Sequence, residues 1–195
     1  DADKEQVSNL SKLDQLEQLI EVYEDIAGKE TVDLSTGIYY DGQNDDEGQR
    51  RAAFKDAIAN PNVGTTILPG DYSTAIGEYS GNTLNNQYYT VDHNVVIKAA
   101  EGSQGYADLR RCGFIVTDGA TLVLEDVRLQ AWQKKPFIGN TTPMNMIRVE
   151  EGTLIANGNT SVLVNRDNGS TEGLKDEDWR GHAIIVGNPD SGSAT

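Results

Sequence analysis

Two stretches of this chain repeat the same order of short apolar segments, and this repeat constrains the fold more than any other feature. Residues 113–129 (GFIVTDGATLVLEDVRL) and 145–164 (NMIRVEEGTLIANGNTSVLV) each contain an apolar strand, an acidic residue with Gly, a Thr-Leu strand, a turn and a third apolar strand. A third copy begins at residues 182–186. Loops of different length join the strands, so the repeat is one of strand pattern and not of fixed length.

Each of these strands has one apolar face, which it can bury only against neighbours. Stacking successive copies supplies those neighbours and gives a continuous core. An antiparallel sandwich of two sheets is the alternative. The expected core residues are Leu122, Leu124, Val127, Leu129, Leu154 and Val162.

The composition agrees with short strands joined by many turns. Only 37% of the 195 residues are hydrophobic and 20 are Gly, which is typical of turn-rich chains. A chain of this length can form one domain with a substantial core.

The stretch before the repeats predicts a short helix that leads directly into a strand. Asp46 with Gln49 fits an N-terminal capping pair, and Asn60-Pro61 ends the helix. The strand Thr65–Leu68 follows and ends at Pro69-Gly70, after which Tyr72 begins another extended piece. The apolar face of the helix consists of Ala53, Phe54, Ala57 and Ile58.

Over residues 41–75 this order resembles the N-terminal cap of pectate-lyase-like right-handed parallel β-helix proteins, with Gln43-Asn44 where that family commonly carries Gly or Thr. The resemblance and the repeats together predict an all-β fold, a right-handed parallel β-helix (solenoid) with an N-terminal amphipathic helix and a short capping helix. We expect residues 1–40 to form a helical segment and linker. Residues 41–195 are expected to form the β-helix, truncated at its C-terminal end.

Residues 11–28 predict the amphipathic helix, because apolar residues recur there at spacings of three and four and Gly28 stands where a helix would end. Two interpretations are open: the helix docks on its own domain, or its apolar face forms a short coiled-coil seam with another chain. The predicted face consists of Leu13, Leu16, Ile20, Tyr23 and Ala27.

The formal net charge of −15 argues against a nucleic-acid partner and against adsorption to anionic membranes. A neutral glycan, a cationic surface or a divalent cation is compatible with it. No apolar run reaches the roughly 20 residues of a membrane span. Cys112 is the only cysteine, which excludes an internal disulfide.

Asp118, Glu151 and Asp190 each lie near the Gly of a corresponding turn, so stacking the copies would bring them into one row. Stacked carboxylates repel unless water or a cation separates them. A calcium site is one interpretation, because calcium prefers oxygen ligands. Exposed acidic turns in an acidic protein are the other.

Aromatic residues in the predicted loops are the candidates for ligand binding, since their faces can stack on sugar rings or anchor a partner protein. We name Tyr88, Tyr89, Trp132 and Trp179. Alternatively, the two tryptophans fold back over the coil as lids.

Catalytic residues are not identifiable from the sequence, so whether the chain is an enzyme is left open. Glycoside cleavage needs carboxylates that converge, and nothing places the available charged residues on one face: Asp108, Arg110, Arg111, Glu125, Asp126 and Arg128.

We therefore predict a secreted or cell-surface module with an adhesin-like or glycan-binding, non-catalytic role, whose partner is a carbohydrate or a surface protein. One alternative is a polysaccharide lyase or glycoside hydrolase, which the resemblance implies. The other is a structural subunit of an extracellular filament, whose copies associate through open coil ends.

Overall fold

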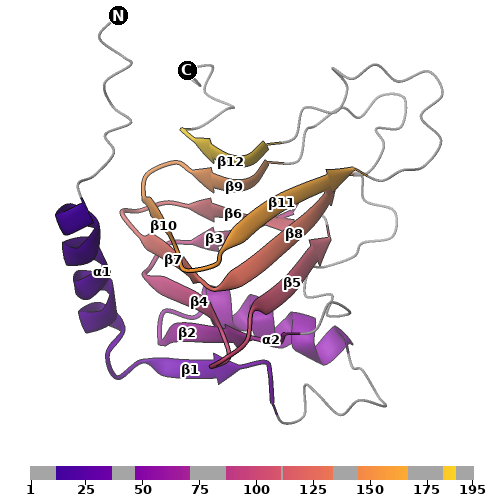
Figure 1. Cartoon of the computed structure of the whole chain (residues 1–195), viewed down its shortest axis with the longest axis horizontal. Helices are drawn as coiled ribbons and strands as arrows, with labels where there is room; N and C mark the ends of the chain where they lie inside the picture. Colours follow the sequence, from indigo (N-terminus) through magenta and orange to yellow (C-terminus); the bar gives the residue numbers. More distant parts are fainter. Residues whose placement is uncertain are drawn as a thin grey trace, which may run out of the picture.

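The computed structural model describes residues 12–36, 47–70, 87–110, 112–133, 145–166 and 182–187. These residues form two helices and a series of short strands (Figure 1). The elements are α1 (Lys12–Ile26), β1 (Glu30–Asp33), α2 (Glu47–Ala59), β2 (Val63–Leu68), β3 (Gln87–Val91), β4 (Val95–Ala99), β5 (Gly105–Arg110), β6 (Cys112–Val116), β7 (Thr121–Glu125), β8 (Val127–Gln133), β9 (Asn145–Val149), β10 (Thr153–Asn157), β11 (Ser161–Arg166) and β12 (His182–Val186).

The strands form three open sheets, in which all the strand pairs of the described residues are parallel. Sheet A has the order β1-β2-β4-β7-β10, sheet B the order β11-β8-β5 and sheet C the order β12-β9-β6-β3. From β4 onward the chain visits A, then B, then C, and repeats this circuit to β12. The all-β class is confirmed, and the antiparallel sandwich is wrong because the strand pairs are parallel.

The strand registers confirm that the two sequence copies stack on each other. Thr121 pairs with Thr153 and Leu122 with Leu154, between β7 and β10. Phe114 pairs with Ile147, between β6 and β9, and Ile147 pairs in turn with Ile184 of the third copy. The repeated pattern therefore marks positions that lie above one another in the same sheet.

The apolar core lies between the three sheets and contains the residues predicted for it. Leu122, Leu124, Val127 and Leu129 have no exposed surface. Leu154 and Val162 are only partly buried, although both pack against the same core, because β10 and β11 lie at the ends of sheets A and B. Burying a side chain of this size fully contributes roughly 1.5–3 kcal/mol.

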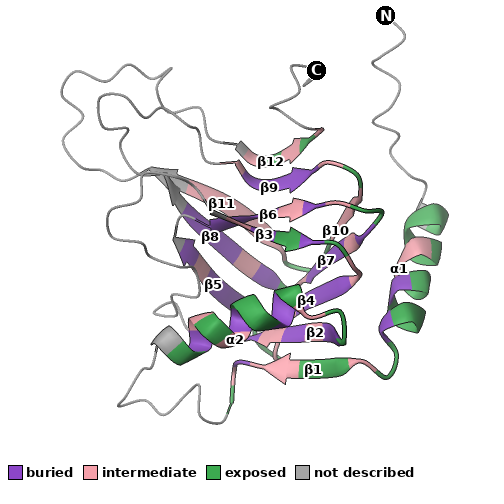
Figure 2. Cartoon of the chain, turned by 180° about the vertical axis from the view of Figure 1, so that it is seen from behind, coloured by how far each residue is buried: buried purple, intermediate pink, exposed green. Residues whose placement is uncertain are grey.

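Helix α2 packs against β2 and β3 and closes one end of the core, as the sequence predicted for a capping helix. Phe54 is fully buried and makes edge contacts with two core rings, Tyr89 at 5.4 Å and Phe114 at 6.3 Å between ring centroids. Figure 2 shows the buried stripe of α2 facing the sheets and its exposed stripe facing away. The predicted strand is confirmed as β2 and ends before Pro69, whereas Asp46 and Tyr72 lie outside the described residues.

Helix α1 forms where the sequence predicted it and docks on its own domain, but through a different face. Val22 and Ile26 are buried against Val96 and Val123, whose side chains point outward from sheet A. The predicted face is wrong: its larger residues, Leu13, Leu16, Ile20 and Tyr23, are between 37% and 63% exposed, and Ala27 is exposed too.

The glycine at position 64 explains how Ile26 comes so close to sheet A. A Cβ atom at Gly64 would lie 2.6 Å from the Cβ of Ile26, which is far inside van der Waals contact. A larger residue at position 64 would therefore hold the helix away from β2. After α1 the chain forms β1 in parallel with β2, within the segment for which the sequence predicted a linker.

Candidate functional site

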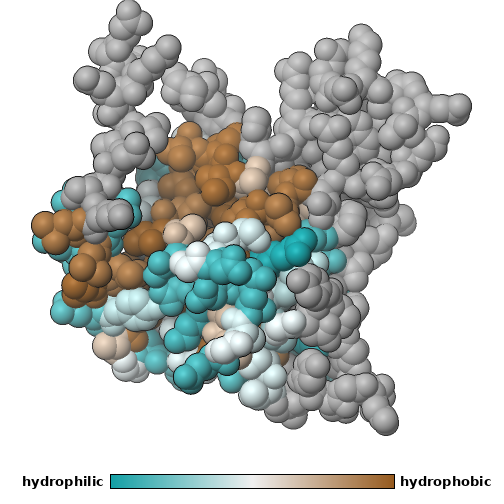
Figure 3. Space-filling model, viewed as in Figure 1, coloured by the Kyte–Doolittle hydropathy of each residue, from teal (hydrophilic) through white to brown (hydrophobic). Residues whose placement is uncertain are grey.

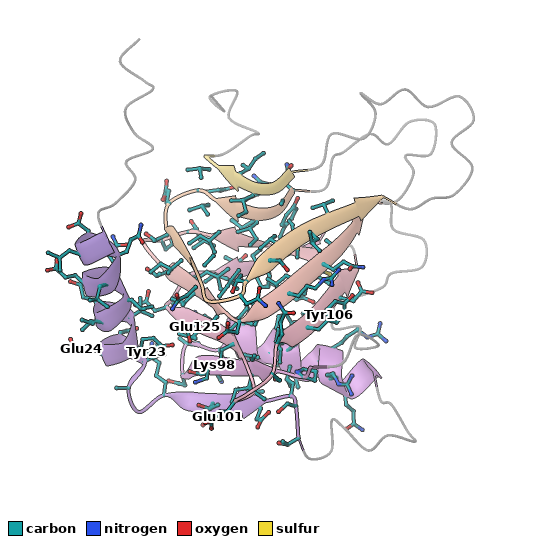
Figure 4. The ribbon with its side chains drawn as sticks, in the orientation of Figure 1. Tyr23, Glu24, Lys98, Glu101, Tyr106 and Glu125 are labelled. Atoms are coloured by element: carbon teal, nitrogen blue, oxygen red, sulfur yellow. The ribbon has the colours of Figure 1, made fainter. Side chains whose placement is uncertain are left out.

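The outer face of sheet A carries a row of polar side chains where α1 packs against it. Lys98, Glu125 and Asn157 are register partners on β4, β7 and β10. Tyr23 of α1 donates a hydrogen bond of 2.6 Å from its hydroxyl to Glu125 Oε2, and Asn157 Nδ2 donates one of 3.4 Å to Glu125 Oε1. Figure 4 shows Tyr23 pointing from α1 toward Glu125 on the sheet.

The contact with Glu125 changes the acidity of Tyr23. Partial burial, followed by the hydrogen bond to Glu125 and the negative charge of that carboxylate, raises the pKa of the Tyr23 hydroxyl well above its usual value. Tyr23 therefore stays protonated across the physiological pH range and acts as a hydrogen-bond donor that joins α1 to sheet A.

A second polar contact holds the C-terminal end of α1. The Asp25 carboxylate accepts a hydrogen bond of 3.1 Å from Lys29 Nζ and another of 3.1 Å from Asn94 Nδ2. Asn94 Oδ1 in turn accepts a bond of 2.9 Å from the backbone N–H of Thr121. The hydrogen bond from Lys29, ahead of that from Asn94, keeps the pKa of Asp25 below its usual value. The polar residues on this face thus serve to dock the helix.

A separate hollow of about 160 Å³ opens beside sheet B. We call it the polar hollow; it is lined by Gly70, Ser103, Gln104, Gly105, Tyr106 and Arg128. Tyr106 and Arg128 are register partners on β5 and β8. Because Ala107 and Leu129 next to them are fully buried, strand alternation places Tyr106 and Arg128 on the outer face of the sheet.

The walls of the polar hollow are held by hydrogen bonds to the backbone. Gln104 Nε2 donates to the carbonyl of Asn159 at 2.8 Å, and Ser103 Oγ donates to the carbonyl of Ala100 at 2.9 Å. The backbone N–H of Tyr106 donates to the carbonyl of Pro69 at 2.7 Å. At Gly105 an added Cβ would come within 3.0–3.2 Å of Leu68, Ala99 and Val127, so a residue without a side chain suits this tight corner.

The polar hollow combines a guanidinium, an amide, a hydroxyl and the buried phenol ring of Tyr106, and its lining residues within the described part of the chain include no carboxylate. Pockets that enclose a drug-sized ligand measure about 300–1,000 Å³, so this hollow suits one small polar group. Sequence reasoning named Arg128 as a charged candidate but missed Gln104 and Tyr106. The available signal was the Gly-Ser-Gln-Gly turn before Tyr106, because recognition residues concentrate on such turns.

Comparisons with known proteins identify no family. A scan against protein-family models, a search of curated proteins and a search of solved structures each find no match to this chain. The resemblance of residues 41–75 to pectate-lyase-like proteins is therefore still an expectation. In the part of the chain that the structure describes, neither helix has the length and apolar character needed to cross a membrane.

The structure places the predicted ligand-binding aromatics in strands where it describes them, and not in loops. Tyr89 alternates with Tyr88 on β3, points inward and packs against Phe114 with 5.7 Å between ring centroids. Its ring is buried in the core, so it has no face to offer a ligand. Trp132 belongs to β8, and Trp179 lies outside the described residues.

Tyr88 is the predicted ligand-binding aromatic that the structure shows partly exposed. The guanidinium carbon of Arg148 lies 5.4 Å from the centre of its ring, within the range of a cation–π contact. Arg148 also pairs with Glu150 at 2.5 Å. Tyr88 is thus already packed against another side chain on sheet C, away from the polar hollow.

Two of the three predicted calcium ligands lie on stacked turns. Asp118 and Glu151 are exposed, and the backbone N–H of Gly119 donates a 2.6 Å bond to the carbonyl of Glu151. Asp190 lies outside the described residues. Within the described ranges no three His, Cys, Asp or Glu side chains gather closely enough to hold a metal ion, and a calcium site at this row stays a prediction.

The charged residues considered for catalysis are divided between faces. Asp108 lies on the outer face of sheet B with Arg128, whereas Glu125 lies on sheet A and accepts the hydrogen bond from Tyr23. Asp126 occupies the corner between the two sheets and accepts a 2.7 Å bond from the backbone N–H of Asn159. For Arg110 the strand but not the side chain is described, and Arg111 lies outside the described residues.

Proposed function

We propose that this chain is a right-handed parallel β-helix module, secreted or displayed on a cell surface, that binds carbohydrate in the polar hollow without cleaving it. The repeated passage of the chain through sheets A, B and C supports the β-helix. Its right-handedness follows from the general rule that connections between parallel strands of one sheet are almost always right-handed.

The composition of the polar hollow carries the proposed binding. The second amide proton of Gln104 and the Arg128 guanidinium can donate hydrogen bonds to the hydroxyl and ring oxygens of a sugar, and Ser103 Oγ can accept one because its own proton is donated to Ala100. Because backbone hydrogen bonds already fix Gln104 and Ser103, little side-chain entropy is lost when a ligand binds. A small preorganised hollow of this kind fits an adhesin-like role, in which one polar group of a sugar chain is held at a time.

Among the residues that the structure describes, the lining of the polar hollow contains no carboxylate, and this composition favours binding over cleavage. Glycoside hydrolysis commonly uses two carboxyl groups on either side of the scissile bond. Asp108 lies on the same outer face of sheet B as Arg128. Glu125 on sheet A accepts its hydrogen bond from Tyr23, whereas the Asp126 carboxylate accepts one from the backbone N–H of Asn159. A hydrolase that uses two carboxylates therefore has weaker support than a binding module.

A screen on an array of plant, microbial and host glycans, with and without calcium, tests this proposal. Any polysaccharide that binds is then incubated with the protein and followed for shorter products. We expect binding without shortening. Release of shorter products would establish the enzyme alternative instead, and absence of binding to every glycan would contradict the carbohydrate site.

A further inference from the structure

The three sheets end together at one end of the molecule, opposite α2 and β1 (Figure 1). Strands β10, β11 and β12 are the last strands of sheets A, B and C, and each has one strand neighbour among the described residues. We call these three strands the β10–β12 end. Their outer edges present backbone N–H and C=O groups that can pair with further strands.

The apolar core reaches the surface at the β10–β12 end. Ile184 pairs with Ile147 and Val186 with Val149, and those partners are buried. Ile184 and Val186 occupy the same inward positions one circuit further on, yet they are 43% and 67% exposed. Leu154, Val162 and Val164 at this end are only partly buried. Figure 3 shows apolar side chains gathered over this region and over α1.

Among the described residues, the opposite end is protected in ways that the β10–β12 end is not. There, α2 inserts Phe54 and Ile58 into the core, and the edge strand β1 carries Glu30 and Asp33. Charged residues and prolines on edge strands commonly prevent pairing with other chains. Strands β10, β11 and β12 contain no Asp, Glu, Lys or Pro, and Arg166 is their one formally charged residue.

We propose that a second copy of this chain covers the β10–β12 end, with the two ends facing each other across a two-fold axis. The chain has a net charge of −15, so two copies repel over most of their surfaces. The strands of the β10–β12 end contain no carboxylate, so these strands add no repulsion between carboxylates when two copies approach.

The size of the β10–β12 end agrees with a modest protein interface. The three strands contain 5, 6 and 5 residues, against about 20–30 residues a side in a standard interface. In a two-fold contact the same patch meets itself, which requires no complementary surface elsewhere on the molecule. Apolar side chains and unpaired strand edges satisfy that condition, because both are self-complementary.

Sedimentation equilibrium of the purified chain over a wide concentration range tests the proposal. We expect a reversible monomer–dimer equilibrium that stops at twice the chain mass. The dimer should tighten with added salt, because salt screens the repulsion between the acidic copies. Ile184→Lys and Val186→Lys should each weaken it by about 10- to 100-fold, the effect of losing one buried apolar side chain.

Helix α1 provides the control, because Leu16 is 53% exposed and lies outside the three strands of the β10–β12 end. Leu16→Lys should leave the dimer unchanged. Far-ultraviolet circular dichroism and thermal melting establish that each variant is folded. A monomer at all concentrations would overturn the proposal, as would a dimer that Leu16→Lys disrupts and Val186→Lys does not. Mass that grows without limit would also overturn it, since that result requires head-to-tail contacts.

Discussion

The hydroxyl of Tyr23 lies 2.6 Å from the carboxylate of Glu125, and this hydrogen bond joins two residues separated by 102 positions in the sequence. It ties α1 to β7, which lies between β4 and the end strand β10 in sheet A. The neighbouring contacts of Val22 and Ile26 are apolar. Burial of these two side chains therefore drives the docking of α1, and the Tyr23 hydrogen bond fixes the orientation of the helix.

Replacing Tyr23 with Phe keeps the ring but removes the hydroxyl. We expect Tyr23→Phe to lower the free energy of unfolding by roughly 0.5–1.5 kcal/mol, the usual contribution of one hydrogen bond. Hydrogen exchange of the α1 amides should accelerate more than that of the core strands. The control is Glu24→Gln, which removes a charge from the exposed side of α1 and should change neither measurement. Equal exchange rates in wild type and Tyr23→Phe would show that Tyr23 does not hold the helix.

The raised pKa of Tyr23 also predicts a loss of stability at alkaline pH. In the unfolded chain a tyrosine loses its proton near pH 10, whereas Tyr23 in the folded chain keeps it because burial and Glu125 raise its pKa. The folded state then binds more protons than the unfolded state, so stability falls as pH rises above about 10. Below that pH the contribution is fully present.

Urea unfolding at several pH values between neutral and strongly alkaline measures this effect. The other titrating groups are common to both proteins, so the difference between wild type and Tyr23→Phe isolates Tyr23. We expect the stability advantage of the wild type to shrink as pH rises through 10. A constant difference across this range would contradict the raised pKa.

Gly64 should tolerate no side chain while α1 is docked. Gly64→Ala would place a Cβ 2.6 Å from the Cβ of Ile26, and overpacking of this kind costs about 1–3 kcal/mol. We expect a lower urea midpoint and faster amide exchange in α1. Gly70→Ala is the matched control for stability, because its Cβ would meet its nearest neighbour at 3.5 Å. If both variants had the same stability, the close approach of Ile26 to β2 would be wrong.

Phe54 should be the most sensitive position of the capping helix. It is fully buried and touches the rings of Tyr89 and Phe114, so Phe54→Ala should cost about 3–5 kcal/mol. Ala52→Ser, on the exposed face of α2, should cost well under 1 kcal/mol. Urea unfolding measures both. A small loss for Phe54→Ala would mean that α2 does not close the core.

The sequence predicted the strands in which apolar and polar side chains alternate clearly and whose apolar pattern recurs in a second copy. The stacking of Leu122 on Leu154 followed from the two copies alone, because the same apolar order recurs in both. Helix α2 could be predicted equally well from the sequence, since Phe54, Ala57 and Ile58 form one compact apolar face.

Features that depend on how distant segments meet were not predicted. The apolar arc of α1 is wide enough to include both Leu16 and Val22, and the choice between them depends on Val96, Val123 and the space at Gly64. The polar hollow depends on the register that sets Tyr106 beside Arg128. The sequence predicts a loop at Tyr89, because a pair of tyrosines does not reveal which ring faces inward.

The central claim is that the polar hollow binds carbohydrate without cleaving it, and one titration tests it most directly. The glycan that binds best in the array is titrated calorimetrically into the wild type, Arg128→Gln and Lys98→Gln, whose substitution lies on sheet A. Losing a charged hydrogen bond costs roughly 1.5–3 kcal/mol, so Arg128→Gln should bind about ten-fold or more weakly. Lys98→Gln should match the wild type, and the recovered glycan should be intact. Equal affinity of Arg128→Gln and wild type, or a shortened glycan, would contradict the claim.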